Sequence, residues 1–221
     1  MSTFFRELRI SIVATVIFAL LCSGVYPVVI WGLSQILFPR LANGSLVEGN
    51  DLTIVGSDLI AQGFSGAKYF HPRPSDAGTG YDATNSGASN LGPTSQKLID
   101  TVKQNVADYR RENGLADNVP VPADAVTASA SGLDPHISPE NARLQAARVA
   151  RERHLSPDAV NAAIQRATDR PLFGFLGGQP GVNVLRLNLA LDGMTEHPQT
   201  TRKRNPSTDY VDYTDLKASG S

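Results

Sequence analysis

The chain has 221 residues, with 20 Lys and Arg against 21 Asp and Glu, one cysteine and a formal net charge of −1. This length suits one ordinary domain with an additional segment. The balanced charge gives no electrostatic footprint for nucleic acid. The single cysteine excludes an intramolecular disulfide framework and a Cys-rich metal cluster.

The apolar residues are concentrated near the N-terminus, where Asp, Glu, Lys, Arg and His are all absent from Ile10 to Pro39. As a helix, residues 10–38 would be about 43 Å long, which exceeds the roughly 30 Å hydrocarbon core of a bilayer. A cleaved signal peptide is the alternative, but its apolar region is only about half as long. The sequence therefore predicts one permanent transmembrane helix over 10–38, which Pro27 could kink.

The Lys and Arg residues that flank this stretch predict its orientation. Arg6 and Arg9 precede it, whereas Arg40 alone follows it before Lys68. Because positive residues favour the cytoplasmic side, we expect residues 1–9 to be a short cytoplasmic N-terminus. The chain after the helix is then an extracytoplasmic domain over 41–192, followed by a polar tail over 193–221 that we expect to be flexible.

The first half of this domain is rich in loops. A strand is predicted at Leu52–Val55, and the Gly, Pro, Ser and Asn residues that follow predict irregular backbone. Disorder is one interpretation of this segment. The other is a loop held to a core by its large apolar side chains, which are Tyr69, Phe70, Tyr81 and Leu91.

Three helices and a strand are predicted in the second half, which makes the domain α+β. Apolar residues spaced three and four apart predict a helix over Thr94–Asn113, capped by Thr94 or Ser95 and ended by Gly114. The repeated pattern Ser-Pro-acid begins two more helices, over 139–153 and 157–168. Leucines alternate with other residues over 185–191, which predicts a half-buried strand. The arginines of the 139–153 helix are expected on a solvated face; they are Arg143, Arg148, Arg151 and Arg153.

Motifs for an ATP-hydrolysing engine are absent from the sequence: it has neither a GxxxxGK[ST] loop nor the phosphorylation sequence of a P-type ATPase. Leu176–Gln179 has the letters of a phosphate-approaching glycine loop, but a glycine turn before a strand explains it better. The histidines show no HxH or HExxH spacing, so no metal site is predicted. Serine, acid and histidine side chains suitable for a tethered hydrolase occur close together, namely Ser129, Ser131, Asp134 and His136, although a tight loop before the next helix explains them more simply.

Four segments, in this order, carry a resemblance to a known family: GSDLIAQGFSGAKYFHPRPS (56–75), YDATNSGASNLGPTS (81–95), VTASASGLDPHISPENARLQAARVARERHL (126–155) and LGGQPGVNVLRLNLALD (176–192). With the apolar stretch before them, they resemble the KdpC family, the C subunit of the bacterial Kdp-type potassium-transporting P-type ATPase. An ordered set of four motifs is far more specific than any one of them.

The resemblance implies a non-catalytic accessory subunit of a high-affinity potassium import complex in the inner membrane. Its implied partners are a potassium channel-like subunit, a P-type ATPase subunit and often a small fourth subunit, in addition to membrane lipid. The family is described as an assembly factor and catalytic chaperone that raises the ATP affinity of the ATPase subunit. ATP is therefore a cofactor by resemblance only, and none is intrinsic to this sequence. An alternative is that the domain caps the potassium entrance and locks the other subunits together.

The family pattern falls on residues expected to act as scaffold or subunit contacts: Gln62, Tyr69, Phe70, Arg73, Pro74, Ser75, Ser89, Asn90, Ser131, Gly132, Leu133, Asp134, Pro135, His136, Asn183 and Asn188. No catalytic residue is predicted. Independently, small residues offer close packing to the membrane helix; these are Ser23, Gly24, Gly32 and Ser34. The rival function from another class is a membrane-tethered envelope hydrolase that uses Ser131 and His136.

Overall fold

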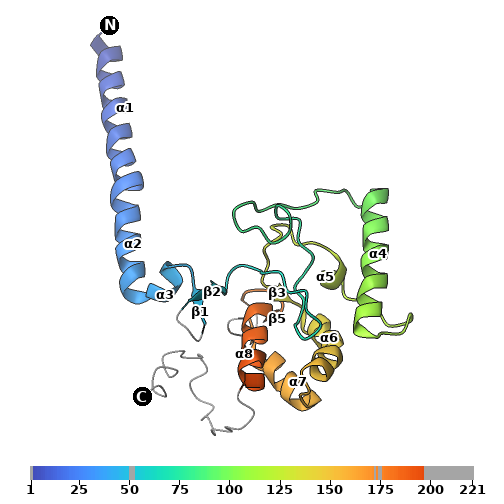
Figure 1. Cartoon of the computed structure of the whole chain (residues 1–221). Helices are drawn as coiled ribbons and strands as arrows, with labels where there is room; N and C mark the ends of the chain where they lie inside the picture. Colours follow the sequence, from blue (N-terminus) through green and yellow to red (C-terminus); the bar gives the residue numbers. More distant parts are fainter. Residues whose placement is uncertain (1, 50–52, 172, 174–175, 197–221) are drawn as a thin grey trace, which may run out of the picture. The chain divides into compact units, whose positions relative to one another are not determined.

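The computed structural model describes residues 2–49, 53–171, 173 and 176–196 (Figure 1). The chain divides into two compact units, Met1–Leu46 and Val47–Ser221. Of the predicted tail 193–221, Gly193–Glu196 complete the last helix, and residues 197–221 lie outside the described residues.

The first unit contains the predicted apolar helix. It consists of α1 (Ser2–Leu20), a π-helical turn η1 (Leu21–Val25), α2 (Tyr26–Leu37) and the short α3 (Pro39–Ala42). The continuous stretch Thr3–Leu37 is long and apolar enough to cross a membrane, and none of its most apolar window is buried within the structure. The large apolar side chains of this helix therefore have no protein core to cover them.

The π-helical turn is the structural effect of Pro27. Proline has no N–H to donate, and its ring clashes with the carbonyl one turn earlier in a regular α-helix. Widening the preceding turn relieves this clash, and the Tyr26 N–H accordingly bonds to the Leu21 carbonyl, five residues back. The helix thus passes Pro27 without ending.

The second unit is built from helices joined by irregular segments. Its helices are α4 (Gln96–Asn113), α5 (Ala123–Val126), α6 (Pro139–Glu152), α7 (Pro157–Arg166) and α8 (Val184–Glu196). The predicted caps of α6 and α7 are confirmed, because Ser138 Oγ accepts the Asn141 N–H and Ser156 Oγ accepts the Ala159 N–H. Gly114 ends α4 at φ +64°, as predicted, but the Ser95 side chain makes no capping bond.

Short strands complete the fold. β1 (Leu46–Glu48) pairs with β2 (Ile54–Ser57), so a strand does lie near the predicted position, in residues 54–57. The other sheet is antiparallel, with β5 (Gly181–Asn183) between β3 (His136–Ile137) and β4 (Thr168–Asp169). These pieces are too short to form a layer, and they instead fix the ends of α6, α7 and α8.

The predicted strand over 185–191 is wrong, because these residues form α8. The leucines that alternate in the sequence also fit a helix: Leu187 and Leu191 share one buried face with Val184 and Asn188, at a spacing of three and four. Asn183 decides the outcome locally, since its Oδ1 accepts the Arg186 N–H in the first turn of α8. A period of two in a short window could not distinguish the two structures.

The core of the second unit lies where α6, α7 and α8 meet the β3–β5–β4 sheet. Residues 58–95 form an irregular segment without helix or strand. Phe70 enters the core from this irregular segment and is fully buried. The loop interpretation of residues 58–95 is therefore the better one, because this segment contributes to the core. The buried apolar side chains are Phe70, Ile137, Ala142, Val149, Ala150, Val160, Ala163, Ile164, Ala167, Val182, Val184, Leu187 and Leu191.

Candidate functional site

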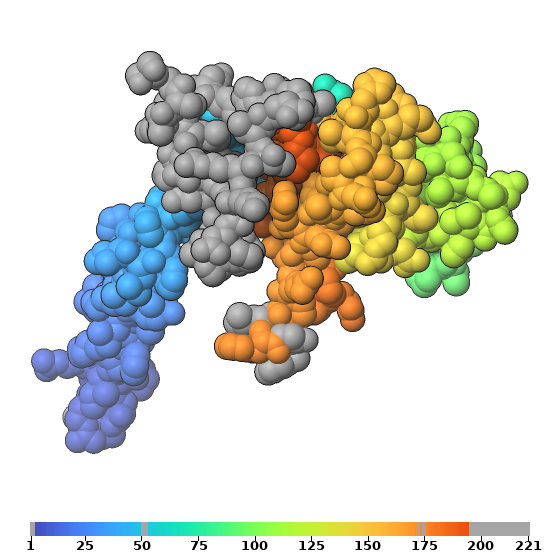
Figure 2. Space-filling view, turned by 90° about the horizontal axis from the view of Figure 1, so that it is seen from below, coloured from blue at the N-terminus to red at the C-terminus, as the bar shows by residue number. Residues whose placement is uncertain are grey.

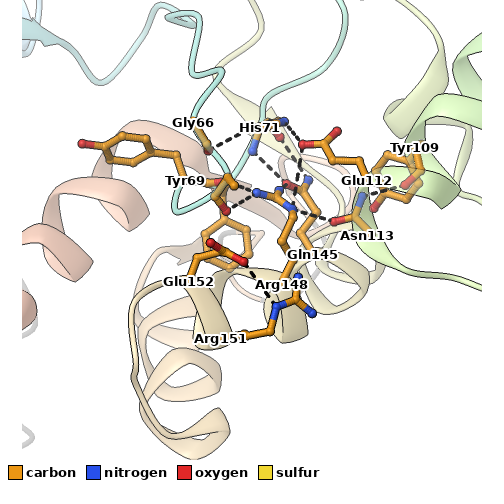
Figure 3. Close-up of polar contacts among 12 residues, drawn as sticks. Gly66, Tyr69, His71, Tyr109, Glu112, Asn113, Gln145, Arg148, Arg151 and Glu152 are labelled. Carbon is orange, nitrogen blue, oxygen red and sulfur yellow. Dashed lines mark hydrogen bonds and ion pairs between the residues drawn. The ribbon is translucent and has the colours of Figure 1, made fainter.

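A buried arginine joins the irregular segment to two helices (Figure 3). The Arg148 side chain on α6 is only 2% exposed. Its Nε donates to Asn113 Oδ1 at 3.0 Å and its Nη2 to Gln145 Oε1 at 3.0 Å. Its Nη1 donates to the carbonyls of Ala67 and Tyr69. One guanidinium thus holds α4 and the segment around Tyr69 against α6.

The side chains around Arg148 are themselves hydrogen-bonded. Gln145 accepts the His71 N–H and donates to the His71 carbonyl, at 2.8 and 3.1 Å. It also donates to Asn141 Oδ1, which accepts the Tyr109 hydroxyl at 2.8 Å. We call His71, Tyr109, Asn113, Asn141, Gln145 and Arg148 the Arg148 cluster. Because buried polar groups are costly unless paired, this cluster specifies one arrangement of loop and helices.

Arg153 makes a second connection of the same kind. Its Nε donates to the Lys68 carbonyl at 2.6 Å, its Nη1 lies 2.9 Å from Asp192 Oδ1, and its guanidinium lies over the Tyr69 ring. The expectation of a solvated arginine face on α6 is therefore wrong for Arg148 and Arg153, which are buried, while Arg143 and Arg151 are exposed.

A groove of about 460 Å³ is lined by members of the Arg148 cluster together with Phe64, Pro74 and Tyr81. His71 stands at its edge, with Nδ1 2.8 Å from Glu112 Oε1 on α4. Burial, followed by the charge of Arg148, lowers the pKa of His71, although Glu112 opposes this shift. The Nε2 atom of His71 also lies 3.1 Å from the Gly66 carbonyl, so the His71 ring joins the irregular segment to α4.

His136 lies in a separate group of charges. Its Nδ1 lies 3.7 Å from Asp134 and its Nε2 lies 2.9 Å from Asp169. Asp134, and then Asp169, raise the pKa of His136, while its partial burial opposes the shift. Arg73 pairs with Asp134 at 3.2 Å, and Arg186 pairs with Asp169. Alternating charges thus connect the irregular segment, β3, β4 and α8.

A nucleophile–base pair is not formed by the serine and histidine that suggested a hydrolase. Ser131 Oγ accepts the Leu133 N–H at 3.1 Å, whereas the His136 ring lies between two carboxylates. No hydrogen bond joins Ser131 to His136 among the interactions of the described residues. Asp134 caps its own turn by accepting the His136 N–H, which is the loop role that the sequence predicts. Ser129 also acts locally, and is buried.

Most other family-pattern residues hold the irregular segment in place. Asn188 binds both the N–H and the carbonyl of Phe70, and Ser75 Oγ donates to the Gly132 carbonyl. Gly132 has φ +68°, and a Cβ there would lie 2.6 Å from the Ala77 nitrogen, so only glycine fits. The remaining contacts are the following: Gln62 donates to the Val55 carbonyl, Leu133 accepts the Ala61 N–H, Pro135 accepts the Val184 N–H, Asn183 donates to the Asp58 carbonyl, and Pro74 lines the groove.

A few predicted residues take no part in these contacts. Ser89 is exposed, and the exposed Asn90 donates only to the nearby Ala88 carbonyl. In the apolar helix, Gly24 and Gly32 would leave open space around an added Cβ. Ser23 is exposed and Ser34 is half-buried.

The centre of the Arg148 cluster is not among the residues that the sequence patterns single out. Arg148 adjoins Val149 on the stripe of α6 that also contains Ala142 and Gln145. The position of Arg148 on that apolar stripe indicates burial. Tyr109 and Asn113 lie on the last two turns of α4 and are buried on its inner face in the same way.

The chain therefore combines a long apolar helix with a domain whose apolar core is accompanied by a buried polar cluster. Comparison of the sequence with known proteins identifies the family of this chain. A sequence model of the family described as "K+-transporting ATPase, c chain" matches residues 8–193.

Individual proteins are also similar to this chain, and three potassium-transporting ATPase KdpC subunits among them match it over most of their length. The Koribacter versatilis protein is 50% identical over 193 residues, which cover 87% of this chain and 97% of the relative. The Mycobacterium tuberculosis H37Rv protein is 50% identical over 187 residues (85% and 98%), and the Myxococcus xanthus protein 53% over 191 residues (86% and 88%).

The chain therefore belongs to the KdpC family, as the four sequence segments predict.

Proposed function

We propose that this chain is a non-catalytic accessory subunit that stabilises the assembly of an ATP-driven potassium import complex. Its relatives are named as subunits of a potassium-transporting ATPase. The observation that carries the proposal is the helix Thr3–Leu37, whose apolar side chains have no protein core to cover them. Such a surface requires lipid and partner helices.

The proposed topology follows from the flanking arginines. Arg6 and Arg9 hold the N-terminus on the cytoplasmic side of the inner membrane, and the second unit lies on the extracytoplasmic side. The Arg148 cluster then serves to keep that unit rigid. A rigid domain on one membrane helix can hold two partner subunits in a fixed arrangement, because little conformational entropy is lost on binding.

ATP is the cofactor that the family resemblance implies, but a domain on the extracytoplasmic side would not meet cytosolic ATP. The glycine turn Leu176–Gln179 is exposed, and it leads to β5, where Gly181 pairs with Asp169 of β4. The Asp169 carboxylate on that strand is already paired with His136 and Arg186. We infer that any effect on ATP affinity passes through contacts with the ATPase subunit.

Purification of the tagged chain from potassium-starved cells tests the proposal. We expect a P-type ATPase subunit and a channel-like subunit to co-purify, and protease added outside the inner membrane to digest the second unit. If the chain purifies without either subunit, it is not an assembly component. If the domain is protected from external protease, the proposed orientation is wrong and direct contact with ATP becomes feasible.

A further inference from the structure

A second groove, of about 490 Å³, lies on α4 away from the Arg148 cluster, and we call it the α4 groove. Val102 and Val106 contribute its apolar surface together with Leu115, which follows the helix. Figure 2 shows α4 (green) at the surface of the second unit. Apolar side chains at the surface of a groove are typical of a binding site for a protein segment.

Positive charge surrounds this apolar surface. Lys103, Arg110 and Arg111 line the α4 groove, with Asp117 as the one acidic residue among its lining side chains. Arg111 also pairs with Asp108, at 2.5 Å. When Asp108 is counted together with Asp117, the three cations still outnumber the two carboxylates. The groove therefore fits a segment that combines acidic and apolar side chains.

The sequence of this chain contains such a segment after the family match, which ends at residue 193. Residues 209–216 read DYVDYTDL. Three aspartates recur every third residue, at 209, 212 and 215, and Tyr210, Tyr213 and Leu216 recur with the same spacing. The acidic and the apolar side chains of this segment therefore alternate along the sequence, which suits a groove lined by both cations and valines.

The length of the connecting chain limits which surfaces the segment can reach. Between Glu196, the last residue of α8, and Asp209 the chain can extend over about 43–47 Å, at about 3.3–3.6 Å per residue. A domain of about 150 residues has a radius of gyration of about 15 Å, a diameter of about 40 Å and hence half a circumference of about 60 Å. Asp209 can therefore reach those parts of the second unit that lie within about 43–47 Å of Glu196 along the surface.

We propose that residues 209–216 bind the α4 groove of the same chain, with the three aspartates facing Lys103, Arg110 and Arg111. The contact covers the half-buried apolar side chains of the α4 groove, Val102, Val106 and Leu115. It is independent of the proposed transport function, because it requires no other subunit.

Disulfide trapping in the full-length chain in detergent tests this contact. Cys22→Ser removes the native thiol, and Ala107→Cys with Thr214→Cys places one thiol in the α4 groove and one in the segment. The matched control pairs Thr214→Cys with Ala147→Cys, because Ala147 is also an exposed helical alanine but lies on α6. Under mild oxidation we expect at least fivefold more intrachain disulfide for position 107 than for position 147.

A charge variant tests the chemistry of the contact. Replacing Asp209, Asp212 and Asp215 with Asn should reduce trapping at position 107 to the level of the control, and so should 0.5 M salt. Equal trapping at positions 107 and 147 overturns the proposal. A disulfide found only between two chains also overturns it, because the groove would then bind a second copy. Trapping that survives the Asp→Asn changes shows that charge does not select the segment and contradicts the proposed pairing.

Discussion

Arg148 shows how one residue can determine the arrangement of several segments. A guanidinium that is 2% exposed would be strongly destabilising alone, but four of its N–H groups donate to oxygen atoms on α4, α6 and the segment around Tyr69. The carbonyls of Ala67 and Tyr69 in turn accept hydrogen bonds from this side chain.

We expect Arg148→Ala to lower the free energy of unfolding by about 3–5 kcal/mol, the range for losing one partner of a buried charged network. Urea unfolding followed by circular dichroism measures this loss. Arg143→Ala, at an exposed position of the same helix, should change stability by about 0.5 kcal/mol or less. Similar losses for both variants would show that the cluster contributes no more than a surface arginine.

His136 provides a pH-dependent contribution to stability. The nearby carboxylates of Asp134 and Asp169 raise its pKa above that of an unfolded-chain histidine, about 6.5. The protonated form therefore favours folding. This contribution is complete below the unfolded pKa and is lost as pH rises through the higher folded pKa.

We expect His136→Gln to remove that pH dependence. The stability difference between the unmodified chain and the variant should be largest near pH 5.5 and should shrink towards pH 8.5. His71 has the opposite effect, because its pKa is lowered and stability is lost as pH falls, but it is present in both proteins and largely cancels. A difference that stays constant over this pH range would contradict the assignment.

Ser131 and His136 also allow a test of the hydrolase alternative. If Ser131 only caps its loop and His136 only joins two carboxylates, Ser131→Ala combined with His136→Ala should leave most potassium uptake intact at neutral pH. Uptake by potassium-starved cells is the measurement, with complex assembly checked in the same cells. Lost uptake from a fully assembled complex would favour a chemical role.

Among the elements, the apolar helix differs from the helices of the second unit because none of its faces is buried in the part of the chain that the structure describes. α4 has one buried face and two arginines in its last turn, whereas the described side chains of η1 and α2 include no buried residue. The π-helical turn before Pro27 keeps the helix continuous. Gly24 and Gly32 lie eight residues apart with open space around them, which permits close approach of another helix.

We expect Gly24→Leu combined with Gly32→Leu to reduce co-purification of partner subunits at least tenfold, because the added side chains prevent close helix packing. The chain itself should still insert into the membrane. Val29→Leu combined with Ile30→Leu is the matched control, since both positions carry exposed branched side chains away from the face of Gly24 and Gly32. Undiminished co-purification of the glycine variant would place the partner contacts elsewhere.

At the scale of the whole molecule, the second unit depends on contacts between segments far apart in the sequence. Phe70 is fully buried, and its N–H and carbonyl are both bound by Asn188, 118 residues later. The irregular segment is therefore part of the cooperative structure, and local opening at this point should require loss of core contacts.

We expect Asn188→Ala to make the chain at least tenfold more sensitive to trypsin at Lys68, which is two residues from the buried Phe70. Asn161→Ala, at an exposed position of α7, should have little effect. Cleavage products identified by mass spectrometry provide the measurement. An unchanged rate at Lys68 would mean that Asn188 does not anchor this segment.

The sequence determined those features that depend on local chemistry. A charge-free stretch of this length predicts the apolar helix, and a serine before proline predicts the starts of α6 and α7 because capping involves only neighbouring residues. Gly114 likewise ends α4 through its own backbone freedom. The family segments were recognised because they keep their order and residue types.

Other features depend on distant partners and follow from the three-dimensional packing. Leu185–Leu191 alternates like a strand, yet it is helical because Val184, Leu187 and Leu191 pack into the core and Asn188 binds Phe70. From the sequence, Arg148 is expected on a solvated face. In the structure it is buried because the carbonyls of Ala67 and Tyr69 accept its N–H groups. Sequence patterns record the polarity of a side chain, whereas its burial depends on which acceptors the fold brings within hydrogen-bond distance.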